Sequence, residues 1–378
     1  MQIPVLVEPD YKDSFWANDI VASIKREIVS KKNDMLMLDG TNLPEIAQSQ
    51  WTKDKNPIII MIGTTLSWTR MAAKYLARNN ISIILVDFAT TSLNTINEIR
   101  GVVQADVLSA ISQLINYLCS VGHSHIALYG VNPNSSDDML MLSYFSKWSG
   151  ENSSAFGHDV FYNRAALSHC YDDFKMVRSA FDSVICVNDI AALSLMNYLE
   201  EDGVKVPEDL YLTSVGNSVL THYGKTPVTS AVLDGQRLGE QAVRLYNWLY
   251  KQEPVCKVQM SIQTSIVVRE STENVPFNER LSNISSYSSD MNYYNFFADQ
   301  EVQQYMTLER LLINTDELDR RFVKYLVAGH TLESLESELF VSISTLRYRL
   351  KRLMTIANCE SRDEFLALIN WAISKRYF

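Results

Sequence analysis

The sequence predicts two α/β lobes followed by a small all-α domain. Throughout residues 1–272, short apolar runs alternate with segments that have helical periodicity. The composition changes near Glu273, and residues 315–378 contain only helical patterns. Strands that alternate with helices are typical of parallel sheets. The length of 378 residues suits two or three globular units, and 47% hydrophobic with 21% charged residues is the balance of an ordinary globular protein.

Residues 1–129 carry the alternation expected of a first lobe. The apolar strands are IPVLVEP, DMLMLDG, NPIIIMIG and ISIILVDF. The predicted helices cover residues 14–31, 67–79 and 106–121. We predict that lobe 1 comprises about residues 1–129, and that residues 233–251 return to it.

A second lobe with the same alternation follows the polar turn NPNSSDD. Its strands are DVFY, SVICV, VPEDLYLTSVG and IQTSIVVRE, and Asn188-Asp189 opens one of its helices. We predict that lobe 2 comprises about residues 130–231 and a strand near 262–269. Residues 273–314 are interpreted as a linker, rich in Ser, Asn and Tyr, and a connecting helix. Residues 315–378 are predicted to form four short helices.

The stretch STLRYRLKR, residues 344–352, carries four cations and no acid in a chain whose formal net charge is -10. Residues 315–378 hold 10 Lys and Arg against 9 Asp and Glu, so DNA contact must be local. At about 100° per residue, Leu346, Leu350 and Leu353 share one helix face, and the cations lie opposite it or at its edges. The predicted DNA-contacting residues are Ser344, Thr345, Arg347, Tyr348, Arg349, Lys351 and Arg352.

Different roles are assigned within this set. Arg347 and Arg349 are expected to reach phosphates, and Thr345, Tyr348 and Arg352 to meet base edges. A basic helix face that is merely solvated is the simpler alternative for an arbitrary sequence.

Three longer stretches of residues 1–272 carry a family resemblance: ADVLSAISQLINYLCSVGHSHIALYG, VICVNDIAALSLMNYLEEDGVKVPEDLYLTSVGNS and LGEQAVRLYNWLYKQEP. Through them, residues 1–272 resemble the ligand-binding core of the LacI/GalR repressors, which has a type I periplasmic-binding-protein fold. The resemblance implies two lobes joined by crossovers, with a small molecule bound between them. The ligand contacts that it implies are Phe15 or Trp16, Asp106, Asn188 and Asn217.

The sequence departs from the sugar-binding members of that family. Met139 and Met141 stand where those members place arginine, Asn217 replaces the usual Asp, and Leu233 replaces a common Gln. Two interpretations remain open. In the first, the effector is a sugar or another metabolite that is less polar than the ligands of those members, and it contacts Met141. In the second, the cleft has lost its ligand and serves as a dimer scaffold or protein-docking surface. An Asn or Asp at a strand-to-helix junction is as often a helix cap as a ligand contact.

The tail resembles a second family. The stretch ELFVSISTLRYRLKRLMTIANCESRDEFLALI is similar, without gaps, to the LuxR-type helix-turn-helix, and TLRYRL is similar to a helix of PucR-type regulators. This resemblance implies a DNA-binding domain at residues 315–378. Because Met1 lies almost at the first strand, we expect the output to come from this tail rather than from an N-terminal helix-turn-helix. A partner-binding or oligomerisation tail, and a solute-binding protein that does not bind DNA, remain as alternatives.

Other classes of function lack the residues they need. The five cysteines form no CxxC pair, and the sequence has no GxSxG, P-loop or HExxH motif. We therefore expect that the protein is not an enzyme and that it binds no metal or cofactor. The N-terminus lacks the features of a signal peptide, and no apolar run approaches the length of a membrane span. We expect a cytoplasmic homodimer with no membrane contact, because paired recognition helices match two half-sites.

Overall fold

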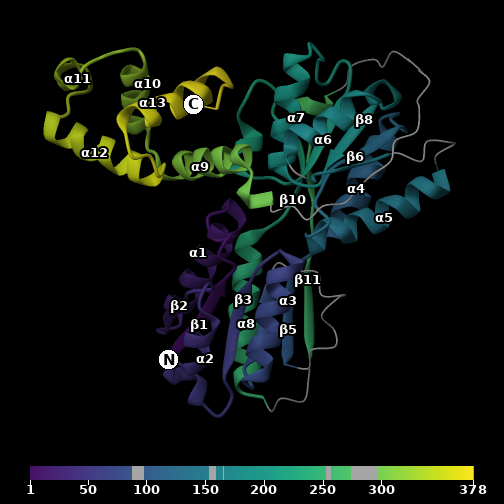
Figure 1. Ribbon diagram of the computed structural model, residues 1–378, viewed down its shortest axis with the longest axis vertical. Coiled ribbons are helices and arrows are strands. Elements are labelled where there is room, and N and C mark those ends of the chain that lie inside the picture. The colour runs from purple at the N-terminus through teal and green to yellow at the C-terminus, as the bar shows by residue number, and fades with distance from the viewer. Residues whose placement is uncertain (87–97, 153–158, 165, 253–256, 274–295, 378) are drawn as a thin grey trace.

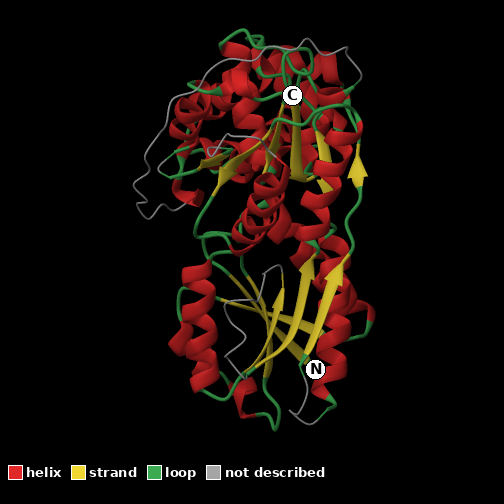
Figure 2. Cartoon of the chain, turned by 90° about the vertical axis from the view of Figure 1, so that its right-hand side faces the viewer, coloured by secondary structure: helices red, strands yellow, loops and turns green. Residues whose placement is uncertain are grey.

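The computed structural model describes residues 1–86, 98–152, 159–164, 166–252, 257–273 and 296–377. Within these residues the chain forms two α/β lobes, stacked along the long axis, and a helical tail beside the second lobe (Figure 1). Figure 2 shows the two sheets one above the other, with helices along both sides. The predicted two-lobed α/β fold is therefore confirmed. The Ser- and Asn-rich part of the predicted linker, 274–295, lies outside the described residues.

The first lobe is a parallel sheet with helices on both faces. Its strand order is β11-β5-β4-β3-β1-β2. The strands are β1 (Gln2–Val7), β2 (Asp34–Leu38), β3 (Ile58–Ile62), β4 (Ser82–Val86), β5 (Ile99–Ala105) and β11 (Val258–Ile262). The helices are α1 (Phe15–Ser30) and α8 (Gly235–Tyr250) on one face and α2 (Leu43–Gln48) and α3 (Leu66–Arg78) on the other. Because both faces are covered, strands such as IIIMI in β3 are buried along their whole length.

The second lobe repeats this architecture with one antiparallel edge strand. Its strand order is β12-β10-β9-β8-β6-β7. The strands are β6 (Ile126–Val131), β7 (Val160–Tyr162), β8 (Ser183–Cys186), β9 (Tyr211–Gly216), β10 (Thr229–Val232) and β12 (Ile266–Val267). The helices are α4 (Val107–Ser120) and α5 (Ser136–Asn152) on one face and α6 (Leu167–Lys175) and α7 (Asp189–Glu201) on the other.

The chain crosses between the lobes three times, and the first crossing differs from the sequence-based boundary at residue 129. Strand β5 ends in the first sheet at Ala105, and α4 already packs against the second sheet. Helical periodicity predicts the apolar face of α4 but not which sheet covers that face. The other crossings follow β10 and β11. The predicted strand near 262–269 therefore corresponds to β12, and β11 just before it belongs to the first lobe.

A segment that we call the arm, Phe296–Asn314, connects the lobes to the tail. It consists of a 3₁₀ turn, Phe296–Ala298, and the helix α9 (Gln300–Asn314). The tail contains four helices as predicted: α10 (Glu317–Val327), α11 (Leu332–Leu339), α12 (Ile343–Ile356) and α13 (Arg362–Ser374). They enclose a core of their own, in which Phe322, Leu335, Leu346, Leu353 and Phe365 are buried.

Candidate ligand cleft and candidate DNA-binding surface

A cavity of about 100 Å³ lies between the lobes, at the carboxyl ends of strands from both sheets. Trp16 and Thr64 line it from the first lobe, and Asn132, Met141 and Asn188 line it from the second. Open α/β folds bind ligands at this position because loops and helix N-termini present polar groups there.

Three of the six predicted cleft residues line this cavity: Trp16, Met141 and Asn188. Phe15, Asp106 and Asn217 do not. Phe15 packs edge-on against Trp16, with the ring centroids 6.1 Å apart. Asp106 caps α4, because its Oδ1 accepts a hydrogen bond from Ser109 N at 3.0 Å. Asn217 accepts a hydrogen bond from the guanidinium of Arg269, so its side chain serves the second lobe rather than the cavity.

Trp16 reaches across from α1 to the end of β9. A β-carbon on Gly216 would lie 2.7 Å from Trp16 Cζ2 and 2.5 Å from Asp189 Oδ2. Gly216 has φ +144°, which favours glycine, and the missing side chain lets Trp16 approach the second lobe closely. The indole Nε1 of Trp16 is buried and has no hydrogen-bond partner among the described residues.

The two lobes are also joined by direct hydrogen bonds between Thr64–Ser67 and Asn134–Ser136, which we call the clasp. Leu66 N donates to Asn134 O at 2.8 Å, and Ser136 N donates to Thr64 O at 3.4 Å. Ser67 N donates to Asn134 Oδ1 at 3.3 Å. The loop after β3 is therefore bonded to the loop after β6, and the lobes are held together on this side of the cavity.

Two buried carboxyl groups that sequence reasoning missed fix the two halves of the clasp. Glu8 Oε2 accepts from Thr64 N at 2.9 Å and from Thr65 N at 3.1 Å. Asp138 accepts from Asn132 N and from Ser135 Oγ, both at 2.9 Å. Burial raises the pKa of Glu8 and raises the pKa of Asp138 to about 7. Two sequence signals could have pointed to these roles: an acid directly after the first strand, and the acids in the turn NPNSSDD.

A third buried carboxylate holds the loop after β9. Asp189 begins α7 and accepts hydrogen bonds from Ser214 Oγ at 2.5 Å and from Ser218 N at 2.6 Å. Its burial raises its pKa. The preceding residue, Asn188, caps the same helix by accepting from Ala191 N at 2.9 Å and also lines the cavity. Asn188 therefore has the capping role, and its position at the cavity leaves contact with a ligand as a prediction.

The predicted DNA-contacting residues fall into two groups on α12. Ser344, Thr345, Arg347, Tyr348 and Lys351 are exposed, and 69% of Tyr348 is accessible. Leu346 and Leu353 are fully buried on the opposite face, as the periodicity predicts. Figure 1 shows α12 at the side of the tail away from the second lobe, so this exposed face is not covered by the body of the protein.

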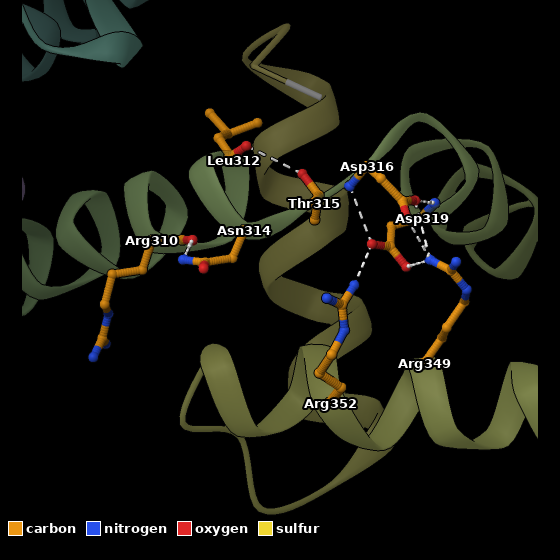
Figure 3. Close-up of polar contacts among 8 residues, drawn as sticks. All are labelled: Arg310, Leu312, Asn314, Thr315, Asp316, Asp319, Arg349 and Arg352. Atoms are coloured by element: carbon orange, nitrogen blue, oxygen red, sulfur yellow. Dashed lines mark hydrogen bonds and ion pairs between the residues drawn. The ribbon is translucent and has the colours of Figure 1, made fainter. Parts of the chain in front are cut away.

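Arg349 and Arg352 point back to α10 instead of outward (Figure 3). Arg349 Nη1 contacts a carboxylate oxygen of Asp316 at 2.8 Å and one of Asp319 at 2.7 Å, and Arg352 Nη2 contacts Asp319. Asp319 is fully buried. Burial opposes ionisation of Asp316, but hydrogen bonds from Arg349 and Asp319 outweigh it and lower the pKa of Asp316. The two arginines therefore join α12 to α10, which differs from the predicted phosphate contact of Arg349 and base contact of Arg352.

Residues 115–272 match the family model of a periplasmic binding protein-like domain. This part of the chain has a periplasmic-binding-protein-like fold. Its relatives include transcriptional repressors named PurR. The one from Vibrio campbellii is 31% identical over 28% of this chain and 31% of its own length, and the one from Histophilus somni is 23% identical over 47% and 55%. The chain thus spans a third to about half of the relatives' length.

Solved structures show that the periplasmic-binding-protein-like fold extends over both lobes. The regulator CelR in complex with cellobiose has a TM-score of 0.60 at 15% identity, with 72% of this chain and 84% of that chain covered. The regulator CcpA of Lactococcus lactis has a TM-score of 0.60 at 20% identity, with coverage of 72% and 100%. The lac repressor dimer bound to operator and an anti-inducer has a TM-score of 0.59 at 17% identity, with coverage of 72% and 93%. The lobes have the fold of a LacI-type ligand-binding core.

The relatives are named repressors rather than enzymes, which is consistent with the expectation of a non-enzyme. Among the residues that the structure describes, no cluster of three His, Cys, Asp or Glu side chains is arranged to hold a metal ion. No helix in the described part of the chain has the length and apolar character needed to cross a bilayer.

Proposed function

We propose that this protein is a transcription regulator that senses a small molecule between its lobes and binds DNA through α12. The observation that carries the proposal is the exposed surface of α12, which presents Arg347, Tyr348 and Lys351 while Leu346 and Leu353 are buried. A helix anchored by leucines and presenting cations, hydroxyls and one aromatic ring is suited to the major groove.

The order of the helices supports this assignment. α11 and α12 are joined by a short turn in which Phe340 adopts the left-handed conformation with φ +55°, and Ser342 caps α12 by accepting from Thr345 N. We interpret the pair as a helix-turn-helix of the LuxR or PucR type, with α12 as the recognition helix. Contact with DNA is assigned to Ser344, Thr345, Arg347, Tyr348 and Lys351. Arg349 and Arg352 are assigned to positioning α12.

The relatives give independent support. They are named as repressors, and one solved neighbour is described in complex with operator DNA and an anti-inducer, another with cellobiose. By analogy we propose that this protein acts in the cytoplasm as a homodimer, so that two copies of α12 meet two half-sites. The small effector is a sugar or another metabolite.

A salt-dependent DNA-binding assay tests the DNA assignment. Removing the whole tail is a poor comparison because Trp371 and Tyr377 pack against the core of the second lobe. The double variant Arg347→Ala/Lys351→Ala removes two exposed cations, and because both side chains are exposed we expect the fold to be kept. We expect it to weaken binding to DNA from upstream of the protein's gene and to lower the slope of log K against log salt by about 2.

A matched control has the same chemistry elsewhere. Arg70 and Lys74 lie on α3 of the first lobe, so Arg70→Ala/Lys74→Ala changes the net charge equally without touching the tail. If both double variants bind DNA alike, α12 is not the DNA-reading element and the tail is a partner-binding module.

A second candidate role for the cleft follows from its size. A cavity of about 100 Å³ is small beside the roughly 300–1,000 Å³ of typical ligand sites, which favours a vestigial cleft in a dimer scaffold. A thermal-shift screen of sugars, nucleosides and other metabolites separates the two roles. A compound that stabilises the wild-type chain but not an Asn188→Leu variant supports an effector site.

A further inference from the structure

The arm contributes two aromatic side chains to the wall of the cleft. Phe296 and Phe297 line the same cavity as Trp16, Met141 and Asn188. The two rings lie edge-on at 5.2 Å, and the Phe297 ring lies 5.7 Å from that of Tyr11 in the first lobe. The segment that leads to the tail therefore touches the candidate ligand site directly.

The arm is firmly attached to the second lobe. Leu167 N donates to Asp299 Oδ2 at 3.0 Å, and Tyr198 donates to Glu301 Oε2 at 3.0 Å. Tyr305 is fully buried and accepts a hydrogen bond from Asn197. Further along α9, Val302, Met306 and Leu308 are buried in the core of the second lobe. Movement of this lobe must therefore carry the arm with it.

The arm also holds the tail in place. Leu311 of α9 is fully buried in the core of the tail, whereas its neighbour Leu312 is buried in the core of the second lobe. The C-terminal end of the tail returns to the second lobe, where Ala372 and Tyr377 are buried and Lys375 contacts Glu201 at 3.3 Å. The second lobe, the arm and the tail are thus packed as one unit.

The arm contacts the first lobe through an ion pair and an aromatic contact. Arg310 Nη1 lies 3.5 Å from Asp13 Oδ1, at a place where about half of Asp13 is exposed. A second contact is the packing of the Phe297 ring against Tyr11. Because an exposed ion pair contributes little, Phe297 at the cleft carries much of the attachment to the first lobe.

The cleft has a recognisable chemical character. Tyr11, Trp16, Phe296 and Phe297 supply aromatic surface, and no Lys, Arg or His occurs among the described residues that line it. The acids Asp137 and Asp138 line it as well, and any charge that they carry disfavours an anionic ligand. The buried indole N–H of Trp16 lacks an acceptor among the described residues, and a buried donor without a partner is costly.

We propose that the arm is a third wall of the effector site, and that this site binds a small neutral molecule whose flat apolar face contacts Phe297. An acceptor atom of that molecule meets the indole N–H of Trp16. This inference rests on the proposed sensing function and extends it: the effector changes the contact between Phe297 and Tyr11, and so changes how the unit that carries α12 is held against the first lobe.

The test uses the full chain and a matched pair of probes. Nicotinamide is neutral, flat and has a carbonyl acceptor, and nicotinate has nearly the same shape but carries a negative charge. Benzamide and uracil extend the neutral set, and methyl glucoside represents a neutral ligand without a flat unsaturated ring. Ligand-observed NMR titration gives the affinities. We expect at least one neutral ring compound to bind ten-fold or more tightly than nicotinate.

Variants at Phe297 then test whether the arm forms part of the binding site. Phe297→Ala should weaken binding of the best neutral probe roughly ten-fold, the value of one good aromatic contact. Phe297→Leu keeps the apolar volume without a flat ring, so it should fold as wild type and bind with intermediate affinity. Phe340→Ala is the matched control, because Phe340 is 93% exposed in the tail. Hydrogen exchange in α9 should slow when the probe binds, while exchange in α8 should not change.

Two results would overturn the inference. One is that no neutral ring compound binds more tightly than nicotinate. The other is that Phe297→Ala, Phe297→Leu and Phe340→Ala bind the best probe equally. DNA binding by α12 is measured separately and without a probe, so a failure here leaves that proposal standing, and loss of the DNA proposal leaves this wall of the cleft testable.

Discussion

Arg347 and Arg349 lie two residues apart on the same helix, and the structure predicts opposite consequences when each is replaced by alanine. The exposed Arg347 should contribute to DNA affinity and hardly to stability. Arg349, whose side chain is 21% exposed, should contribute to the stability of the tail and hardly to the salt dependence of binding. Sequence periodicity alone assigned both residues to phosphate.

The magnitude follows from the contacts that Arg349 makes. Its guanidinium donates to Asp316 at 2.8 Å and to the fully buried Asp319 at 2.7 Å. A hydrogen bond to a charged group contributes about 1.5–3 kcal/mol, and the partial exposure of Arg349 reduces this. Arg352 still reaches Asp319 in the variant, so Asp319 keeps one cationic partner. We therefore expect Arg349→Ala to lower the stability of the tail by about 1–2 kcal/mol.

Hydrogen exchange of the α10 and α12 amides measures this change locally, because a chain with several units need not unfold in one step. Arg349→Ala should speed exchange in both helices about ten-fold, and Arg347→Ala should leave it unchanged. In the DNA assay, Arg347→Ala should lower the salt slope by about 1. If Arg349→Ala leaves exchange unchanged and lowers the salt slope as much as Arg347→Ala, the two arginines have the same role and the ion-pair argument is wrong.

Three further predictions concern other parts of the chain. Gly216→Ala places a β-carbon 2.5 Å from Asp189 at φ +144°, so urea unfolding should show a loss of about 3 kcal/mol; an unchanged midpoint would show that Trp16 does not approach this closely. Phe340→Gly relieves a left-handed phenylalanine that is 93% exposed, and it should stabilise the tail by about 1 kcal/mol in hydrogen exchange; a loss of stability would indicate a packing role for the ring. Burial raises the pKa of Glu309 from 4.5 to about 8, so the native state keeps a proton that the unfolded chain releases, and stability falls as pH rises between these values. Glu309→Gln should therefore flatten the decline in unfolding free energy between about pH 5.5 and pH 8.5, and a decline as steep as in the wild type would contradict the assignment.

The fold could be predicted from the sequence because its signals are local. A strand that is covered on both faces must be apolar along its length, as the IIIMI strand is. A helix that is anchored on one face must carry apolar residues at helical spacing, and Leu346 and Leu353 have this spacing. The assignment of α4 to a lobe failed because periodicity carries no information about which of two sheets covers its apolar face.

The contacts that organise the cleft and α12 are not local, and this is why they were missed. Asp319 and Arg352 are 33 residues apart, and their pairing depends on how α10 packs across α12. Glu8 meets Thr64 over 56 residues, and Tyr11 meets Phe297 over a greater separation. A helical projection correctly placed Arg352 away from the leucines, but a long side chain can still turn back to a buried carboxylate. Charge on a helix face predicts DNA contact only after the acids of neighbouring helices are known.

Three of the contacts that hold the lobes and the arm together differ in what could release them. The clasp is made of backbone and amide hydrogen bonds held by Glu8 and Asp138, and Trp16 fills the space left by Gly216. Neither the clasp nor the contact of Trp16 with the second lobe involves the segment that leads to the tail. The contact of Phe297 with Tyr11 is different, because Phe297 belongs to the arm, and the arm continues through Leu311 into the core that supports α12. An effector can shift an equilibrium only by binding its two states unequally. A molecule that contacts Phe297 would meet this condition, since its binding energy depends on the position of the same segment that supports α12, the helix proposed to bind DNA.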